Sequence, residues 1–290
     1  MKFSVATISL PTLTPAECAA AIKSAGFAGV EWRVEPKPGS ISDPVPAHPF
    51  LVDHKGTVPL TIEAARDAAT LTRHHGLELV GLAPYVEVGD HETLRLVAAM
   101  TREAGAPHFR LQAPRISRTG LPYATLFDQT MDFFAAIESE AHSNGVRALL
   151  EIHHNTICSS AALAYRLLSH FDPRRVGVIY DLGNLVFEGY EEHSIALDLL
   201  GPYLGHVHLK NAAHFRAADG GWKADWTPLE DGEVRVPEFL AFLQSRGYDR
   251  WVSIEDMSLN RSPLDTLYHN AAQLREWARS ADSRAAACAL

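Results

Sequence analysis

The stretch VIYDLGNL, residues 178–185, decides the fold, because an apolar run ends there in a carboxylate. Val178, Ile179 and Tyr180 lead directly to Asp181, and a Gly and an Asn follow within three residues. A strand that delivers an acid at its end either caps a loop or contributes to a site. The choice depends on whether other apolar runs in the chain end in the same way.

Short apolar runs of this kind recur along the 290 residues, and eight of them are predicted to be strands. They are rich in β-branched residues and show little alternation, which is typical of strands buried on both faces of a parallel sheet. The predicted strands are 3–8, 28–32, 78–83, 108–112, 147–152, 176–181, 205–209 and 251–255.

Helical segments separate these strands, and many of them end in a glycine, as in AIKSAGFAGVEW and AHSNGVRALLEI. Glycine commonly ends a helix because it adopts the left-handed conformation without a steric penalty. The sequence TPAE predicts a capping box between Thr14 and Glu17, and Ser159 or Ser160 is predicted to begin another helix. The eight β/α units predict an α/β protein, a single (β/α)₈ TIM barrel over residues 1–290.

Two connections are too long for simple loops, residues 33–60 after the second strand and 210–236 after the seventh. Both follow the carboxyl ends of strands, where barrels of this type build their active sites. Long loops in such places are usually lids or substrate walls. Residues 210–236 are therefore expected to cover the substrate and exclude water.

The composition excludes several classes of function. No apolar stretch is long enough to span a membrane, and the amino-terminal residues lack the pattern of a signal peptide. The formal net charge of −9 argues against a nucleic-acid partner, because phosphate binding needs a basic surface. Three scattered cysteines suggest a reducing compartment, so a cytoplasmic protein is expected. The sequence leaves open whether the chain forms a homo-oligomer.

Four consecutive predicted strands end in residues that bind metals. The fifth carries Glu151 at its carboxyl end, the sixth ends at Asp181, the seventh carries His206 and His208, and the eighth ends at Glu255. The ends of parallel strands converge in a closed barrel. Carboxylates crowded together without a cation would repel one another. Three carboxylates and one imidazole suit Mn²⁺ or Mg²⁺, and they can also hold Co²⁺, Fe²⁺ or Zn²⁺.

Each of these residues alone has an ordinary explanation, as a solvated strand end, a turn acid or a core histidine. Their coincidence at matching strand ends favours a site. His206 and His208 face the same side of their strand, because side chains alternate. His208 lies nearer the strand end and is the predicted ligand, whereas His206 is predicted to be structural.

The chain resembles the xylose isomerase-like TIM-barrel superfamily, the sugar phosphate isomerase/epimerase group, in LLEIHHNT, VIYDLGNLVFEG, HVHLKNA, PLEDGEVRVPEFLAFLQSRGYDRW and VSIED. This resemblance covers nearly the whole chain. It implies that one divalent metal ion is bound by Glu151, Asp181, His208 and Glu255. It also implies an isomerase or epimerase acting on a ketose or aldose through a metal-stabilised enediolate, with Glu151 and Glu255 exchanging the proton.

The chain departs from related epimerases at two places. Asn184 stands where they commonly carry a histidine, and Ile157 stands where they carry an acid. The same enediolate leads to dehydration when a hydroxyl β to the carbonyl leaves, so a lyase acting on a keto-sugar or cyclitol is an alternative. A further alternative is a barrel that binds sugar without catalysing a reaction. The missing histidine and the negative charge argue against the DNA-cleaving relatives.

Five further residues are candidate contacts to a small carbohydrate substrate. An arginine just past the seventh strand contacts substrate in related epimerases, and a tryptophan can stack on a sugar face. Each candidate also has an ordinary structural explanation, as a core residue, a turn residue, part of a packed wall or a solvated surface residue. The candidates are His153, Asn184, Lys210, Arg216 and Trp32.

Overall fold

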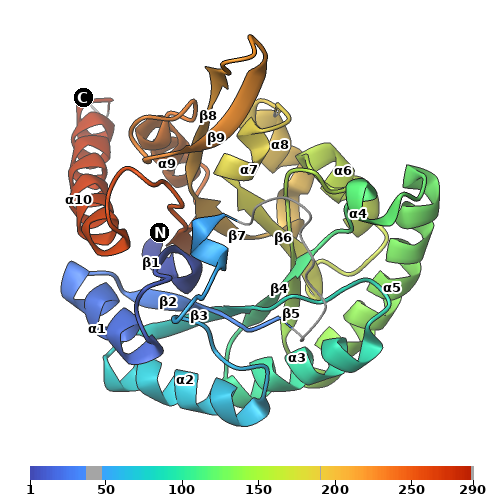
Figure 1. Cartoon of the computed structure of the whole chain (residues 1–290). Coiled ribbons are helices and arrows are strands. Elements are labelled where there is room, and N and C mark those ends of the chain that lie inside the picture. Colours follow the sequence, from blue (N-terminus) through green and yellow to red (C-terminus); the bar gives the residue numbers. More distant parts are fainter. Residues whose placement is uncertain (37–47, 190, 289–290) are drawn as a thin grey trace.

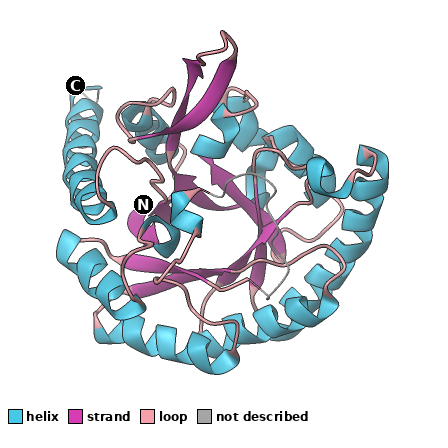
Figure 2. Cartoon of the chain, viewed as in Figure 1, coloured by secondary structure: helices cyan, strands magenta, loops and turns pink. Residues whose placement is uncertain are grey.

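Eight parallel strands close into a barrel, and helices surround it (Figure 1). The computed structural model describes residues 1–36, 48–189 and 191–288. Neighbouring strands follow the order β1-β10-β7-β6-β5-β4-β3-β2, so β1 and β2 close the ring. Figure 2 shows the strands inside and the helices outside, which confirms the predicted (β/α)₈ barrel.

The barrel strands lie close to the predicted bounds. They are β1 (Lys2–Ala6), β2 (Gly29–Arg33), β3 (Glu78–Ala83), β4 (His108–Gln112), β5 (Arg147–Glu151), β6 (Val176–Asp181), β7 (Leu204–Leu209) and β10 (Trp251–Ile254). The α-helices are α1 (Pro15–Ala25), α2 (Ile62–His74), α3 (His91–Ala104), α4 (Ile116–Thr119), α5 (Tyr123–Asn144), α6 (Ala161–Leu168), α7 (Leu182–Val186), α8 (His193–Leu200), α9 (Val236–Ser245) and α10 (Pro263–Cys288). Short 3₁₀ helices are η1 (Thr7–Ser9), η2 (Pro49–Leu51) and η3 (Gly201–Tyr203).

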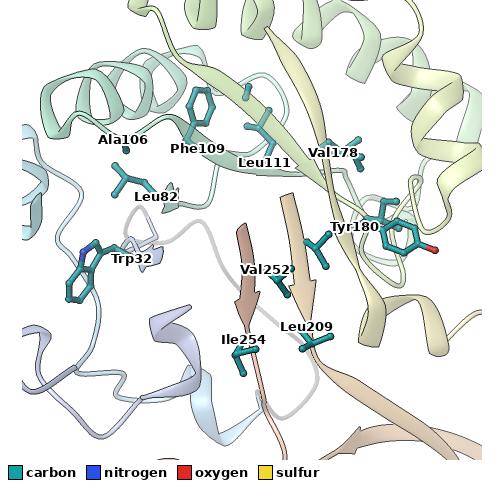
Figure 3. Packing of buried hydrophobic residues seen from close by; sticks show 14 of the residues in the cluster. Trp32, Leu82, Ala106, Phe109, Leu111, Val178, Tyr180, Leu209, Val252 and Ile254 are labelled. Carbon is teal, nitrogen blue, oxygen red and sulfur yellow. The ribbon is translucent and has the colours of Figure 1, made fainter. Parts of the chain in front are cut away.

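The apolar core is a layer between the strands and the helices. Alternate residues of each strand turn outward into this layer, because side chains of a strand point to opposite faces. Figure 3 shows these buried side chains around the strands. They include Trp32, Leu82, Phe109, Leu111, Val178, Tyr180, Leu209, Val252 and Ile254.

The residues between these outward positions turn polar side chains into the barrel. In β2, Glu31 and Arg33 flank Trp32, and in β4, Arg110 lies between two outward residues. Charged side chains are almost never buried unless they are paired. The barrel interior is therefore a polar network, and the apolar layer outside it supplies most of the hydrophobic stabilisation.

The predicted helix starts are largely confirmed. Thr14 Oγ1 accepts from the backbone N–H of Glu17, whose carboxylate in turn accepts from the backbone N–H of Thr14 at 2.8 Å. This reciprocal pair is the capping box that the sequence predicts. Ser160, and not Ser159, caps α6.

The two long connections differ in what they form. Of residues 33–60, those from 37 to 47 lie outside the described residues. Residues 210–236 are not an irregular loop, because β8 (Asn211–Arg216) and β9 (Trp222–Thr227) pair as an antiparallel hairpin. This hairpin projects from the carboxyl end of β7 beyond the barrel (Figure 1). Throughout the part of the chain that the structure describes, no helix combines the length and apolar character needed to cross a membrane.

We expect Thr14→Ala to destabilise the protein by about 1 kcal/mol, since removing an N-cap side chain leaves a backbone donor of α1 without its partner. Thr14→Ser keeps the hydroxyl and serves as the control. Urea unfolding followed by circular dichroism measures the difference. Equal midpoints for the Ala variant and the wild type would contradict this role of the cap.

Candidate metal centre

The carboxyl ends of four neighbouring strands bring the predicted ligands together. Glu151 ends β5, Asp181 ends β6, His208 lies one residue before the end of β7, and Glu255 directly follows β10. One ligand atom from each residue lies within 4.8 Å of the others. All four side chains are buried, with at most 3% of the residue exposed. We call these four residues the ligand cluster.

The spacing of the ligand cluster fits a single ion. His208 Nδ1 lies 2.7 Å from Glu255 Oε2, 3.5 Å from Asp181 Oδ2 and 3.6 Å from Glu151 Oε1. Atoms that share one divalent ion at about 2.0–2.4 Å lie within roughly 5 Å of one another. His208 Nδ1 and Glu255 Oε2 form no hydrogen bond despite their burial. Such a group of buried ligand atoms without hydrogen bonds suits a cation.

Asp181, at the end of the apolar run in VIYDLGNL, both caps a helix and belongs to the ligand cluster. Its Oδ1 accepts from the backbone N–H of Asn184 at 2.8 Å and caps α7. Its Oδ2 faces the ligand cluster and forms an ion pair with Lys210 Nζ at 3.0 Å. Gly183 is needed beside it, since a Cβ there would lie 2.4 Å from Lys210 Cγ. The short helix therefore fixes the carboxylate through Oδ1, while Oδ2 points to the ligand cluster and to Lys210.

Glu31 contacts the Nε2 side of the His208 imidazole, and the sequence analysis did not single it out. Its Oε2 lies 3.0 Å from His208 Nε2 and 3.2 Å from His206 Nε2. Burial opposes its ionisation, but the two imidazoles hold the pKa of Glu31 well below its ordinary value. A carboxylate that accepts from Nε2–H leaves Nδ1 of His208 for a metal ion. The signal was visible in GVEWR, where Glu31 alternates with an outward Trp32.

Two buried cations neutralise the carboxylates of the ligand cluster. Burial raises the pKa of Glu151, but Arg110, whose Nη1 lies 3.0 Å away, holds that pKa well below its ordinary value. Lys210 Nζ lies 3.5 Å from Glu255 and 3.0 Å from Asp181. Its charge outweighs burial at Glu255, whose pKa is lowered. At Asp181 burial prevails and raises the pKa to about 6.

The carboxylates around His208 favour a positive charge at its Nδ1, which either a proton or a metal ion would supply. Burial opposes its protonation, but Glu31 and Glu255 raise the pKa of His208 well above its ordinary value. Metal ions displace protons from such ligands, since a ligand imidazole must be neutral at the coordinating nitrogen. The same carboxylates therefore attract both cations to one place.

Asn184 and His153 lie beside Glu151, as the sequence places them. Asn184 is completely buried, and its Nδ2 donates to Glu151 Oε1 at 3.2 Å. Burial, and then the charge of His154, lowers the pKa of His153 well below its ordinary value. His154, which the sequence reasoning did not single out, hydrogen-bonds Asn184 Oδ1 at 2.6 Å and stacks on Phe187. His154 and Phe187 thus form an aromatic wall, which contacts the ligand cluster through Asn184.

Two predicted substrate contacts do not lie at the site. Trp32 is completely buried in the outer layer, where its indole N–H donates to Thr72 Oγ1 of α2 at 2.9 Å. The expectation that Trp32 stacks on a sugar is wrong, because strand alternation points it away from the barrel axis. Arg216 is exposed at the end of β8, over the ring of Trp222. Trp226, at the base of the same hairpin, does reach the site, with its ring 4.7 Å from Lys210 Nζ.

A small pocket, open to solvent, lies directly against the ligand cluster. His208 and Glu255 form part of its wall, so a small molecule in the pocket would touch them. Its position at the carboxyl ends of the strands matches the active-site face of barrels of this type. The remaining lining residues are Ala6, Thr7, Ile8, Arg33, Ala83, Tyr85 and Arg110.

The sequence profile of the xylose isomerase-like TIM barrel family matches residues 19–281 of this chain. The chain belongs to the xylose isomerase-like TIM barrel family. An inosose dehydratase from Geobacillus thermodenitrificans is 22% identical over 172 residues, which are 55% of this chain and 56% of that protein. The match thus spans about half the length of this curated relative.

Solved structures of similar shape cover nearly the whole chain. The 3-keto-D-glucoside 4-epimerase YcjR from E. coli has a TM-score of 0.70 and 16% identity, over 95% of this chain and 99% of that one. A xylose isomerase-like TIM barrel protein from Mycobacterium smegmatis in complex with magnesium has a TM-score of 0.65 and 16% identity, over 97% of each chain. At these identities the likeness concerns the fold. The chain is thus a xylose isomerase-like TIM barrel with a candidate metal centre beside a pocket.

We expect Glu31→Gln to weaken Mn²⁺ binding by about 10–100-fold, because the amide no longer holds His208 as a carboxylate does. Isothermal titration calorimetry measures the dissociation constant directly. Glu35→Gln, which changes an exposed carboxylate just after β2, is the matched control. An unchanged affinity in a folded Glu31→Gln protein would show that Glu31 does not support a ligand.

Proposed function

We propose that this chain is a divalent-metal-dependent isomerase or epimerase of a small hydroxyketone carbohydrate. The observation that carries the proposal is the ligand cluster, whose donor atoms lie within 4.8 Å of one another beside a pocket. Mn²⁺ or Mg²⁺ is the preferred ion, since three of the four ligands are carboxylates. The magnesium in the similar M. smegmatis protein agrees with this preference.

The residues of the ligand cluster fit the ion, and Glu151, Asp181, His208 and Glu255 would hold it. A bound divalent ion supplies Lewis-acid chemistry, which favours loss of a proton next to the substrate carbonyl. Lys210, held by Asp181 and Glu255, would neutralise charge that the substrate develops.

Glu151 and Glu255 are the residues that we propose to move the substrate proton. They come from β5 and from the residue after β10, and β6 and β7 separate these strands in the barrel. The two carboxylates therefore approach the ligand cluster from different strands of the barrel. One would remove the proton from carbon and the other would return it, which permits a change of configuration or of carbonyl position. Arg110 and Lys210 keep the pair ionised, since they lower both pKa values.

Dehydration is the second candidate, and the likeness to inosose dehydratase favours it. Both reactions begin with removal of the proton next to the carbonyl. Loss of a hydroxyl from the neighbouring carbon then gives an unsaturated ketone, whereas return of the proton gives an isomer. Asn184 stands where related epimerases have a histidine, and its amide is engaged by Glu151 and His154.

The aromatic wall, which contacts the ligand cluster through Asn184 and Lys210, would shield the reaction from water. Trp226 of the hairpin packs with its ring centre 4.6 Å from that of Phe187, and the Lys210 ammonium lies over the Trp226 ring. We propose that this base of the 210–236 segment covers the substrate. Excluding solvent strengthens the electrostatic interactions of the site and limits side reactions of an unstable intermediate.

The test is incubation of the protein and Mn²⁺ with ketoses, inososes and 3-keto-glycosides in deuterated water. We expect solvent deuterium at the carbon next to the carbonyl, and EDTA should abolish its incorporation until Mn²⁺ is restored. Mass spectrometry distinguishes isomerisation, which conserves mass apart from deuterium, from dehydration, which loses water. Exchange that persists in metal-free protein would refute the metal dependence.

Glu255→Gln tests whether Glu255 moves a proton besides holding the ion. At saturating Mn²⁺ we expect exchange to fall by about 10²–10⁴-fold, the usual contribution of a general acid or base. Glu78→Gln, which changes an exposed carboxylate at the start of β3, is the matched control. Full rescue of Glu255→Gln by added Mn²⁺ would show that Glu255 is only a ligand.

A further inference from the structure

Arg33 is a buried cation at the mouth of the barrel. It ends β2 and turns inward, two residues beyond Glu31 on the same face of the strand. Only 7% of the residue is exposed. It lines the pocket together with His208 and Glu255, so its guanidinium shares that space with the ligand cluster.

The partners that Arg33 has among the described residues are neutral. Its Nε donates to the hydroxyl of Tyr85 at 3.3 Å, and its Nη1 donates to Thr57 Oγ1. Within residues 1–36, 48–189 and 191–288, no carboxylate forms an ion pair with it. Arg110, the other arginine of the pocket, differs because Glu151 compensates its charge. A buried charge is costly unless an opposite charge accompanies it.

The charges around the pocket show how Arg33 differs from the other buried cations, Arg110 and Lys210. Glu31, Glu151, Asp181 and Glu255 are the four buried carboxylates of the barrel interior, whereas the buried Asp256 accepts a hydrogen bond from Asn270 of α10. Arg110, Lys210 and the two charges of the proposed divalent ion would compensate these four. His54, which contacts Thr57, adds no charge near neutral pH, because burial and the charge of Arg33 lower its pKa to about 4. Among the residues that the structure describes, one positive charge is then left over, and it belongs to Arg33.

We infer that the substrate is an anionic hydroxyketone, and that Arg33 binds its carboxylate or phosphate group. This inference rests on the proposed function for the position of the reacting carbons, which lie at the ligand cluster. A guanidinium fork matches both oxyanions through two parallel hydrogen bonds. Tyr85 and Thr57 hold the fork in place, and the Tyr85 ring lies 5.3 Å from the Arg33 guanidinium carbon.

The test compares three ligands that share one carbon skeleton. L-sorbose is the neutral ketose, 5-keto-D-gluconate carries a carboxylate at the far end from the ketone, and L-sorbose 6-phosphate carries a phosphate there. Isothermal titration calorimetry with the full chain measures their affinities, both with Mn²⁺ and in metal-free protein. We expect at least one anion to bind tenfold or more tightly than L-sorbose, as charge-assisted hydrogen bonds predict. The metal-free arm excludes binding of the anion to Mn²⁺ as the cause.

Arg33→Gln should remove this preference, and Arg33→Lys should keep part of it, because the charge remains while the fork is lost. Arg66→Gln is the matched control, since Arg66 is exposed on α2 and pairs with Glu103. Unchanged Mn²⁺ binding by the Arg33 variants shows that they fold. Should Arg33→Gln fail to fold, Tyr85→Phe removes one partner of the fork and should reduce the preference.

Equal binding of the three ligands to the wild type would overturn the inference, and so would a preference that survives in folded Arg33→Gln. These results do not depend on turnover. Anion preference without deuterium exchange would support the role of Arg33 and refute the proposed reaction. Exchange on L-sorbose without anion preference would support the reaction and refute the role of Arg33.

Discussion

The burial of four carboxylates inside the barrel is the constraint on which the rest of the structure depends. Glu31, Glu151, Asp181 and Glu255 are each at most 3% exposed. Isolated buried charges cost several kcal/mol each unless they are paired and hydrogen-bonded. The barrel therefore has to bring cations inside as well, and it does so with Arg110 and Lys210.

Strand alternation makes this arrangement compatible with stability. Each strand gives its outward residues to the apolar layer and its inward residues to the polar network, so the two functions do not compete for positions. In β2 the residues Glu31 and Arg33 face the site, while Trp32 packs against α2. The rigid outer layer holds the strand ends in place, and a site on such elements is more precise than one on loops.

The sequence was sufficient for the barrel and for the residues at the strand ends, because an apolar run that stops at an acid marks both the strand and its end. It was insufficient for Glu31, Arg33 and Arg110, since strands interpreted as apolar on both faces leave no reason to assign an inward side. Trp32 was misplaced for the same reason, as one residue of register changes the face. The hairpin of residues 211–227 was missed because its strands are polar and largely exposed.

The pairing of charges also constrains which substitutions such a site can tolerate. Glu151 is held ionised by Arg110, and Asp181 and Glu255 share Lys210, so removing one member leaves the other as an uncompensated buried charge. Breaking a buried pair costs more than replacing both members, which ties these positions to one another. Arg33 is outside this constraint, because its described partners are hydroxyl groups. In its proposed role, Arg33 would respond to a change in the charge of the substrate, while the charge pairs around the proposed ion would stay as they are.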